Sequence, residues 1–135
     1  MRKLTINPKL CTNCHICELA CSFKQSQNLS LFKSCVNTVF LTSENITIPV
    51  TCLQCVEAAC VSACPAKAIS KNEKTGAVVI DYDLCIRCRT CIGACPFGNI
   101  LFDDSPDRGK VYKCNLCSGD PMCAKFCPTQ AELCR

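Results

Sequence analysis

The chain has 135 residues, enough for one compact body or two small lobes that share a core. Eighteen residues are cysteine, a content typical of a secreted disulfide scaffold or of a metal-binding protein. The formal net charge is +4, but the sequence has no run of Lys or Arg. It therefore lacks the basic cluster that is typical of a nucleic-acid-binding protein.

The first residues, Met1 to Pro8, hold basic side chains but neither the apolar core nor the small-residue cleavage site of a secretory signal. No uncharged apolar run approaches the length of a membrane span. We therefore expect a soluble cytoplasmic protein, because disulfides are rare in that reducing compartment and clustered thiols there are typically metal ligands. Since Trp is absent and only 6% of residues are aromatic, bound metal would have to organise a core that side chains alone leave thin.

In chain order, the first predicted element is a strand over residues 3–6, which an Asn7-Pro8 turn ends. The first cysteine motif follows with the spacing C-x2-C-x2-C-x3-C and consists of Cys11, Cys14, Cys17 and Cys21. Ser22 comes next, so the proline that ends the later motifs is missing. Within the motif, His15 could tune a metal centre through a hydrogen bond or a charge, but we expect a half-exposed loop residue with no special role.

Residues 22–50 form a long connection without metal-ligand spacing. Its apolar residues allow two interpretations, a hairpin that shields metal centres or a surface that docks a partner, and we favour shielding. These apolar residues are Leu29, Leu31, Phe32, Val36, Val39, Phe40 and Leu41. Cys35 lies outside every motif and is expected to pack as a small hydrophobic residue.

The second and third motifs each follow a predicted strand, over residues 46–50 and 77–81. The second motif consists of Cys52, Cys55, Cys60 and Cys64, followed by Pro65, and the third of Cys85, Cys88, Cys91 and Cys95, followed by Pro96. The third has the C-x2-C-x2-C-x3-C-P spacing with which bacterial ferredoxins hold [4Fe–4S] clusters, and in two-cluster ferredoxins the fourth cysteine binds the neighbouring cluster. Arg87 and Arg89 flank its cysteines and are expected to be solvated surface charges.

The fourth motif follows a strand predicted over residues 110–113 and consists of Cys114, Cys117, Cys123 and Cys127, before Pro128. Lys113, like Arg87 and Arg89, could raise the potential of a neighbouring cluster electrostatically, but we expect a solvated surface charge. Cys134, beyond the motif, is expected to be a mobile free thiol. All four motifs share three residues before the last cysteine. The repeat of strand, cysteine triad, short helix and fourth cysteine indicates duplication of a two-cluster module.

Zinc and disulfides are the alternatives to iron–sulfur clusters. Structural zinc takes two close cysteine pairs, and the second and fourth motifs alone could be interpreted that way. In the first and third motifs, a third cysteine follows the close pair after two further residues, and a closed zinc site has no place for it. Three cysteines so close together would also favour wrongly paired disulfides. The chain has one histidine and no Ser-His-Asp set, paired acid–base carboxylates, G-x-G-x-x-G or P-loop. With four cysteines on every cluster no iron stays open to substrate, so we expect an electron relay and no enzyme activity.

The motifs resemble those of the four-cluster ferredoxin-like electron-transfer subunits of multisubunit oxidoreductases. The similarity lies in residues 11–23, the longer middle gap of the second motif, residues 86–98 and residues 114–129. Members of this family accompany molybdenum or tungsten bis-pterin enzymes (dimethyl sulfoxide reductase, formate dehydrogenase, tungsten aldehyde oxidoreductase), hydrogenases and carbon monoxide dehydrogenases. The short fourth motif makes the chain most similar to the compact subunits of the carbon monoxide dehydrogenase and tungsten enzyme systems. Asn13 and Arg87 stand where the family often has glycine, which puts the local backbone in question.

The resemblance implies four [4Fe–4S] clusters, with the first motif paired with the fourth and the second with the third. The outer pair would supply Cys11, Cys14, Cys17 and Cys127 to one cluster and Cys21, Cys114, Cys117 and Cys123 to another. The inner pair would supply Cys52, Cys55, Cys60 and Cys95 to a third and Cys64, Cys85, Cys88 and Cys91 to the fourth. The implied fold class is α+β, a tandem bacterial-ferredoxin-like fold in one unit over residues 1–135. Its inner two-cluster lobe (46–100) would be inserted into a pseudo-symmetric outer lobe (1–45 with 101–135).

The expected function is the relay of single electrons between a catalytic oxidoreductase subunit, of molybdenum/tungsten-pterin or nickel–iron type, and a second carrier such as a further iron–sulfur or flavin subunit. We expect a role in anaerobic metabolism, with neither a nucleic-acid partner nor insertion into a membrane. Three alternatives stay open: a free soluble polyferredoxin that shuttles between enzymes and, with much less support, a zinc-stabilised interaction protein or a hidden enzyme activity in one cluster with an exchanged ligand.

Overall fold

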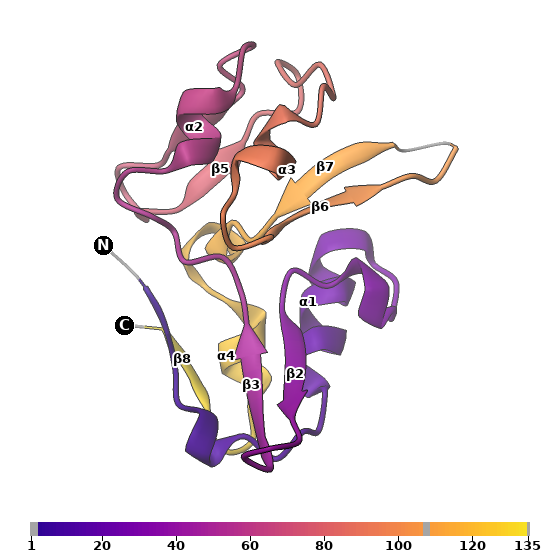
Figure 1. Cartoon of the computed structure of the whole chain (residues 1–135), viewed down its shortest axis with the longest axis vertical. Helices are drawn as coiled ribbons and strands as arrows, with labels where there is room; N and C mark the ends of the chain where they lie inside the picture. Colours follow the sequence, from indigo (N-terminus) through magenta and orange to yellow (C-terminus); the bar gives the residue numbers. More distant parts are fainter. Residues whose placement is uncertain (1–2, 107–108, 135) are drawn as a thin grey trace.

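The computed structural model describes residues 3–106 and 109–134, which form short helices and antiparallel two-stranded sheets (Figure 1). The helices are α1 (Ile16–Ser26), α2 (Ala59–Ala63), α3 (Thr90–Ala94) and α4 (Met122–Phe126), with 3-10 turns η1 (Pro8–Leu10), η2 (Leu31–Lys33) and η3 (Leu116–Gly119). The strands are β1 (Leu4–Ile6), β2 (Asn37–Leu41), β3 (Ile46–Val50), β4 (Ile69–Lys71), β5 (Val78–Ile80), β6 (Ile100–Asp103), β7 (Lys110–Lys113) and β8 (Glu132–Cys134). Within these ranges, no helix has both the length and the apolar character needed to cross a bilayer.

The sheets join neighbouring strands in three cases and the two ends of the chain in the fourth. β2 pairs with β3, β4 with β5, and β6 with β7, whereas β1 pairs with β8, so that Leu4 lies opposite Cys134 (Figure 1). The strands predicted before each motif are confirmed, as is the mixed α+β class. The prediction that Cys134 is a mobile thiol is wrong, because β8 is held by the N-terminal strand, a pairing too distant in sequence to be foreseen.

Prolines set the length of the short helices. Cys64, Cys95 and Cys127 each precede a proline and end α2, α3 and α4 with nearly the same backbone angles (φ −76°, −77° and −71°; ψ 110°, 112° and 110°). A following proline disfavours the α conformation in the preceding residue, so each helix ends at its cysteine. Cys21 is followed by Ser22 instead, and α1 runs on for more than a turn beyond it.

Cysteines make up much of the buried core. One cluster of buried side chains contains Cys17, Cys21, Cys35, Val36, Ala77, Tyr112, Cys114, Leu116 and Cys123, and a second contains Cys60, Ile69, Val78, Cys91, Ile100 and Val111. We call these the first and second core clusters. Helix α1 packs against α4 in the first, and α2 packs against α3 beside the second (Figure 1). The prediction for Cys35 is confirmed, since only 4% of it is exposed.

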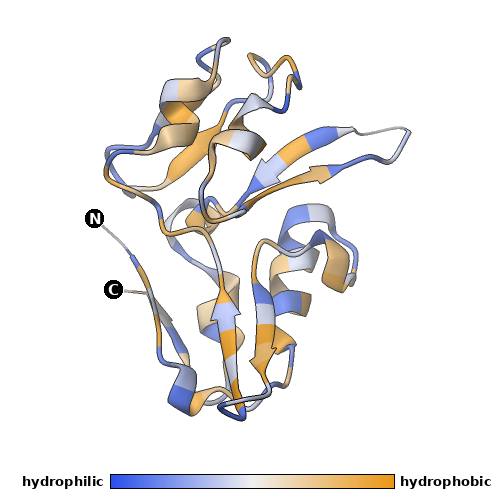
Figure 2. Ribbon diagram, viewed as in Figure 1, coloured by the Kyte–Doolittle hydropathy of each residue, from blue (hydrophilic) through white to orange (hydrophobic). Residues whose placement is uncertain are grey.

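The β2–β3 hairpin and the segment before it carry apolar side chains that lie open. Val36 is buried, but Phe32 is 92% exposed, and Figure 2 shows hydrophobic residues along β2 and β3. The exposed set, which we call the hairpin surface, consists of Leu29, Leu31, Phe32, Val39, Phe40 and Leu41. The hairpin forms as predicted, but the shielding interpretation is wrong for all of its apolar residues except Val36.

Candidate metal centres

Three hollows in the structure are each lined by four cysteines. The first hollow has Cys52, Cys55, Cys60 and Cys95 in its wall, the second Cys64, Cys85, Cys88 and Cys91, and the third Cys11, Cys14, Cys17 and Cys127. Each combines three cysteines of one motif with the last cysteine of another. The hollows are similar in size, with about 380, 330 and 310 Å³ of empty space including their mouths. The structure thus brings together three of the quartets that the resemblance implies.

Three cysteines of the remaining quartet lie in the first core cluster. Cys21, Cys114 and Cys123 pack there together, and burial, followed by the charge of Cys21, raises the pKa of Cys117, which places this fourth thiol nearby. The N–H of Cys35 donates to Cys21 Sγ over 3.3 Å. Hydrogen bonds from the Cys35 thiol and backbone lower the pKa of Cys21 to about 6 against the effect of burial. Cys35 therefore supports this quartet from outside the motifs.

The loops inside the cysteine motifs share a left-handed backbone conformation. The residue before the second cysteine has a positive φ in every motif: 57° at Asn13, 50° at Gln54, 59° at Arg87 and 54° at Leu116. The residue after that cysteine repeats this in three motifs, with φ of 59° at His15, 63° at Arg89 and 60° at Ser118. Runs of this kind gather successive N–H groups into a concavity that binds anions, as at many iron–sulfur sites.

The left-handed conformation at Arg87 predicts that glycine is favoured there. A side chain in this region costs about 1–2 kcal/mol, while glycine adds about 0.5–1 kcal/mol of backbone entropy to the unfolded chain. Arg87→Gly should therefore raise the free energy of unfolding of the metal-loaded protein by about 0.5–1 kcal/mol. Thermal unfolding followed by circular dichroism under argon tests this, with Arg87→Ala as control, because alanine keeps the strained Cβ. Equal midpoints for the two variants would contradict the prediction.

Glu132 is a buried acid at the junction of two quartets. It lines the third hollow with no exposed surface, and its carboxylate lies beside the thiols of Cys17 and Cys123. Burial and then the charge of Glu132 raise the pKa of Cys17 and of Cys123, which belong to different quartets. Glu132 therefore places one buried acid next to both outer quartets.

The chemistry of these sites fits [4Fe–4S] clusters. Burial raises the pKa of the thiols of Cys60, Cys91 and Cys114, so they need a nearby positive charge to become thiolates, and iron supplies such a charge. The quartets would hold the iron, and the loop N–H groups would face the cluster sulfur. When bound, such clusters supply one-electron redox chemistry. The chain's own part is to fix the ligands, exclude water and set the surrounding charge.

His15 has a structural role that the sequence did not reveal. Its side chain is 40% exposed, as expected, but Nδ1 lies 2.6 Å from Oε2 of the buried Glu18 and 2.9 Å from Oγ1 of Thr38. Glu18 also accepts a hydrogen bond from the N–H of Thr38 over 2.5 Å. The expectation of no special role is therefore wrong: this network ties the start of α1 to β2, a strand more than twenty residues away.

Lys113 is buried rather than solvated. Only 3% of it is exposed, and its Nζ donates to the backbone oxygens of Val78 and Cys114, the latter over 2.8 Å. The prediction failed because β7 packs against β5, which no local pattern shows. Arg87 and Arg89 are exposed as predicted, with Arg89 stacked over the Phe102 ring at 3.7 Å.

Gln54 joins the two core clusters, a role that no sequence pattern indicates. Its Nε2 donates to the carbonyl of Cys114 over 2.9 Å, and its Oε1 accepts from the N–H of Val78 over 2.8 Å. In the sequence it is only a spacer between Cys52 and Cys55. Its role depends on contacts with residues that lie 24 and 60 positions further along the chain.

Comparisons with known proteins agree with these sites. A 4Fe-4S dicluster domain model matches residues 43–134, and a 4Fe-4S binding domain model matches residues 8–24. The chain is 39% identical to the polyferredoxin-like subunit of aliphatic sulfonate oxidoreductase from Pyrococcus furiosus, over 92% of this chain and 70% of that one. It is 30% identical to the electron transport protein HydN of Escherichia coli, over 92% of this chain and 82% of that one.

The fold is also found in a solved structure, the active site complex BamBC of benzoyl coenzyme A reductase. All of this chain matches 76% of the chain in that complex, with a TM-score of 0.56 and 24% identity, a level that shows the fold alone. The family matches decide between the zinc and iron–sulfur interpretations in favour of iron–sulfur. This chain therefore belongs to the 4Fe-4S dicluster domain family of ferredoxin-type electron-transfer proteins.

Proposed function

We propose that the chain relays single electrons between a catalytic oxidoreductase subunit and a second carrier. The observation that carries this proposal is the grouping of cysteines from different motifs round the same hollows. The sixteen motif cysteines would bind four [4Fe–4S] clusters in the quartets given above, with Cys21, Cys114, Cys117 and Cys123 as the quartet without a hollow. Because each cluster would have four cysteine ligands, we infer that the chain itself is not catalytic.

The contacts between quartets support a continuous route. Glu132 lies beside Cys17 and Cys123, which belong to the two outer quartets. Cys52, from the first hollow, packs against the first core cluster that holds Cys114. Cys60 and Cys91, one from each inner quartet, share the second core cluster. An electron could therefore pass from the third hollow through the core to the first and second hollows without crossing solvent.

The exposure of the cysteines suggests where electrons enter and leave. Among the described cysteines, Cys14 and Cys88 are the exposed ones. They belong to the third and second hollows, at the two ends of the proposed route, and the loops before α1 and α3 lie toward opposite ends of the molecule (Figure 1). A relay needs one accessible site for each redox partner, and this arrangement provides both.

We also propose two two-cluster lobes, an inner one near residues 46–100 and an outer one from the two ends. The packing of α1 on α4 and of α2 on α3 supports this division. The β2–β3 and β6–β7 hairpins span the proposed boundaries at residues 46 and 100, so the lobes would share elements there.

The hairpin surface is our candidate for contact with the catalytic subunit. It is apolar and open, and exposed apolar groups of this kind typically mark protein interfaces. The relative from Pyrococcus furiosus is named as a subunit of an oxidoreductase. For this chain we propose a larger molybdenum-, tungsten- or nickel–iron-containing partner, in the cytoplasm and in anaerobic metabolism.

Anaerobic purification from the native source tests the proposal. We expect about sixteen irons and sixteen acid-labile sulfides per chain, and a large subunit that co-purifies in fixed ratio. Phe32→Asp and Phe40→Asp should release that subunit without loss of iron, whereas Val56→Asp, at an exposed site outside the hairpin surface, should not. A fully loaded monomer would instead indicate a free polyferredoxin, and far fewer irons would overturn the relay.

A further inference from the structure

The three cysteine hollows differ in the charge that lines them. The first contains the buried Lys113, the second contains Arg89 on its exposed rim, and the third contains the buried Glu132. A charge inside the protein interacts with a neighbouring charge far more strongly than one exposed to water and salt. The first hollow is therefore the one with an unscreened cation in its wall.

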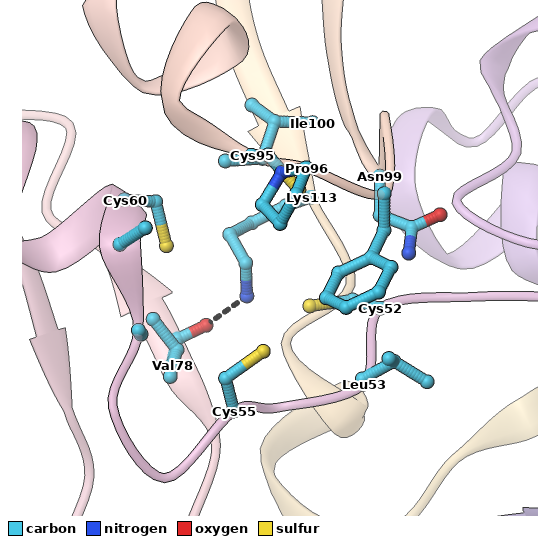
Figure 3. Close-up of a pocket in the computed structure, with 13 residues that line it drawn as sticks. Cys52, Leu53, Cys55, Cys60, Val78, Cys95, Pro96, Asn99, Ile100 and Lys113 are labelled. Carbon is cyan, nitrogen blue, oxygen red and sulfur yellow. Dashed lines mark hydrogen bonds between the residues drawn. The ribbon is translucent and has the colours of Figure 1, made fainter.

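The ammonium group of Lys113 has one donor to spare. It can donate three hydrogen bonds, and two of them go to the backbone oxygens of Val78 and Cys114. No other acceptor among the described residues takes the third. Figure 3 shows Nζ in the same space as the sulfur atoms of Cys55 and Cys60. The two carbonyls thus hold a positive charge, with an unused N–H, among the cysteines of this hollow.

Lys113 and Cys60 line the same hollow, and the ammonium group is buried with them. A buried cation lowers the free energy of negative charge placed beside it. Adding an electron to a cluster held by cysteines makes it more negative, so a nearby cation and a hydrogen bond to sulfur both favour the reduced state.

We propose that Lys113 raises the reduction potential of the centre held by Cys52, Cys55, Cys60 and Cys95, making it the site where a single electron preferentially rests. The inference depends on the proposed function, because it assumes that these cysteines hold a cluster. Lys113, which is not a ligand, would thus set the reduction potential of one of the four proposed clusters. The exposed Arg87, which also stands beside cysteine ligands, has no such effect because solvent screens its charge.

Redox titration of the anaerobic holoprotein, followed by electron paramagnetic resonance, tests this. Lys113→Gln and Lys113→Met both remove the charge, and glutamine keeps a donor for the carbonyls. At a fixed ambient potential, each should lower the reduced-to-oxidised ratio of one cluster at least tenfold, which is 59 mV for a one-electron couple. Lys113→Arg, which keeps the charge, and Arg87→Gln, which removes an exposed charge, should change that ratio less than threefold.

Several outcomes would overturn the proposal. One is an unchanged ratio in both neutral variants with their iron complete, and another is an equal shift in Arg87→Gln. Loss of iron from both neutral variants would also overturn it, because Lys113 would then hold the site together rather than set its potential. Failure of the proposed function is separate, since it would show as missing iron and sulfide in the unmodified protein.

Discussion

Replacing Cys95 by alanine is expected to remove the cluster that Cys52 helps to hold and to spare the one held by Cys91, its own motif neighbour. Cys95 lines the first hollow with Cys52, while Cys91 lines the second. Losing one of four ligands in a site that solvent can reach should empty it, so iron should fall from about sixteen to about twelve per chain. Iron and sulfide analysis of the anaerobic protein measures this loss.

The identity of the lost cluster is the decisive part of this test. In the reduced protein, Cys95→Ala and Cys52→Ala should abolish the same electron paramagnetic resonance signal, and Cys91→Ala a different one. Cys134→Ala serves as the control and should keep all of the iron, because Cys134 belongs to no quartet and lines none of the three hollows. If Cys95→Ala and Cys91→Ala erased one common signal, the fourth cysteines would serve their own motifs, and the interleaved quartets would be refuted.

Removing the iron should unfold most of the protein. Few of the large apolar side chains that the structure describes are fully buried, and these include Leu116, Val36, Val78 and Val111. Burying so few side chains does not offset the conformational entropy that the backbone loses on folding. Most of the other buried side chains in the first core cluster are cysteines. Without metal they are free thiols, and each buries only a small apolar surface.

Iron removal by ferricyanide and a chelator should therefore abolish most of the far-ultraviolet circular dichroism and the cooperative thermal transition. Rebuilding the clusters with iron and sulfide under reducing conditions should restore both. Treatment with the chelator alone is the control for effects on the bare chain. An iron-free protein that kept its spectrum and melted cooperatively would show that the side chains suffice.

The sequence predicted the local features well because a few residues decide them. The strands before the motifs and the short helices within them follow from neighbouring residues. The extension of α1 beyond Cys21 was not predicted, although the missing proline accounts for it. Asn13 and Arg87 stand where the family often has glycine, and both adopt the left-handed backbone conformation that glycine takes without strain.

What the sequence could not predict depends on packing between distant elements. Lys113 looks like any lysine at the end of a strand, and only the approach of β5 buries it. Cys134 is fixed by a strand from the opposite end of the chain. The residues of the hairpin surface were predicted to shield metal centres, because apolar residues near metal motifs are usually buried. They are exposed instead, and none of the described residues covers them.

The pairing of β1 with β8 has a consequence for how the protein is made. Every cysteine of the inner quartets has left the ribosome once residue 95 emerges, and these two sites can close early. The outer quartets wait for Cys123 and Cys127, so the thiols of Cys11 to Cys21 stay open to oxygen and to wrong metals for longer than those of the inner quartets. Iron that is present before Cys127 has emerged can fill the inner sites but cannot complete the outer ones.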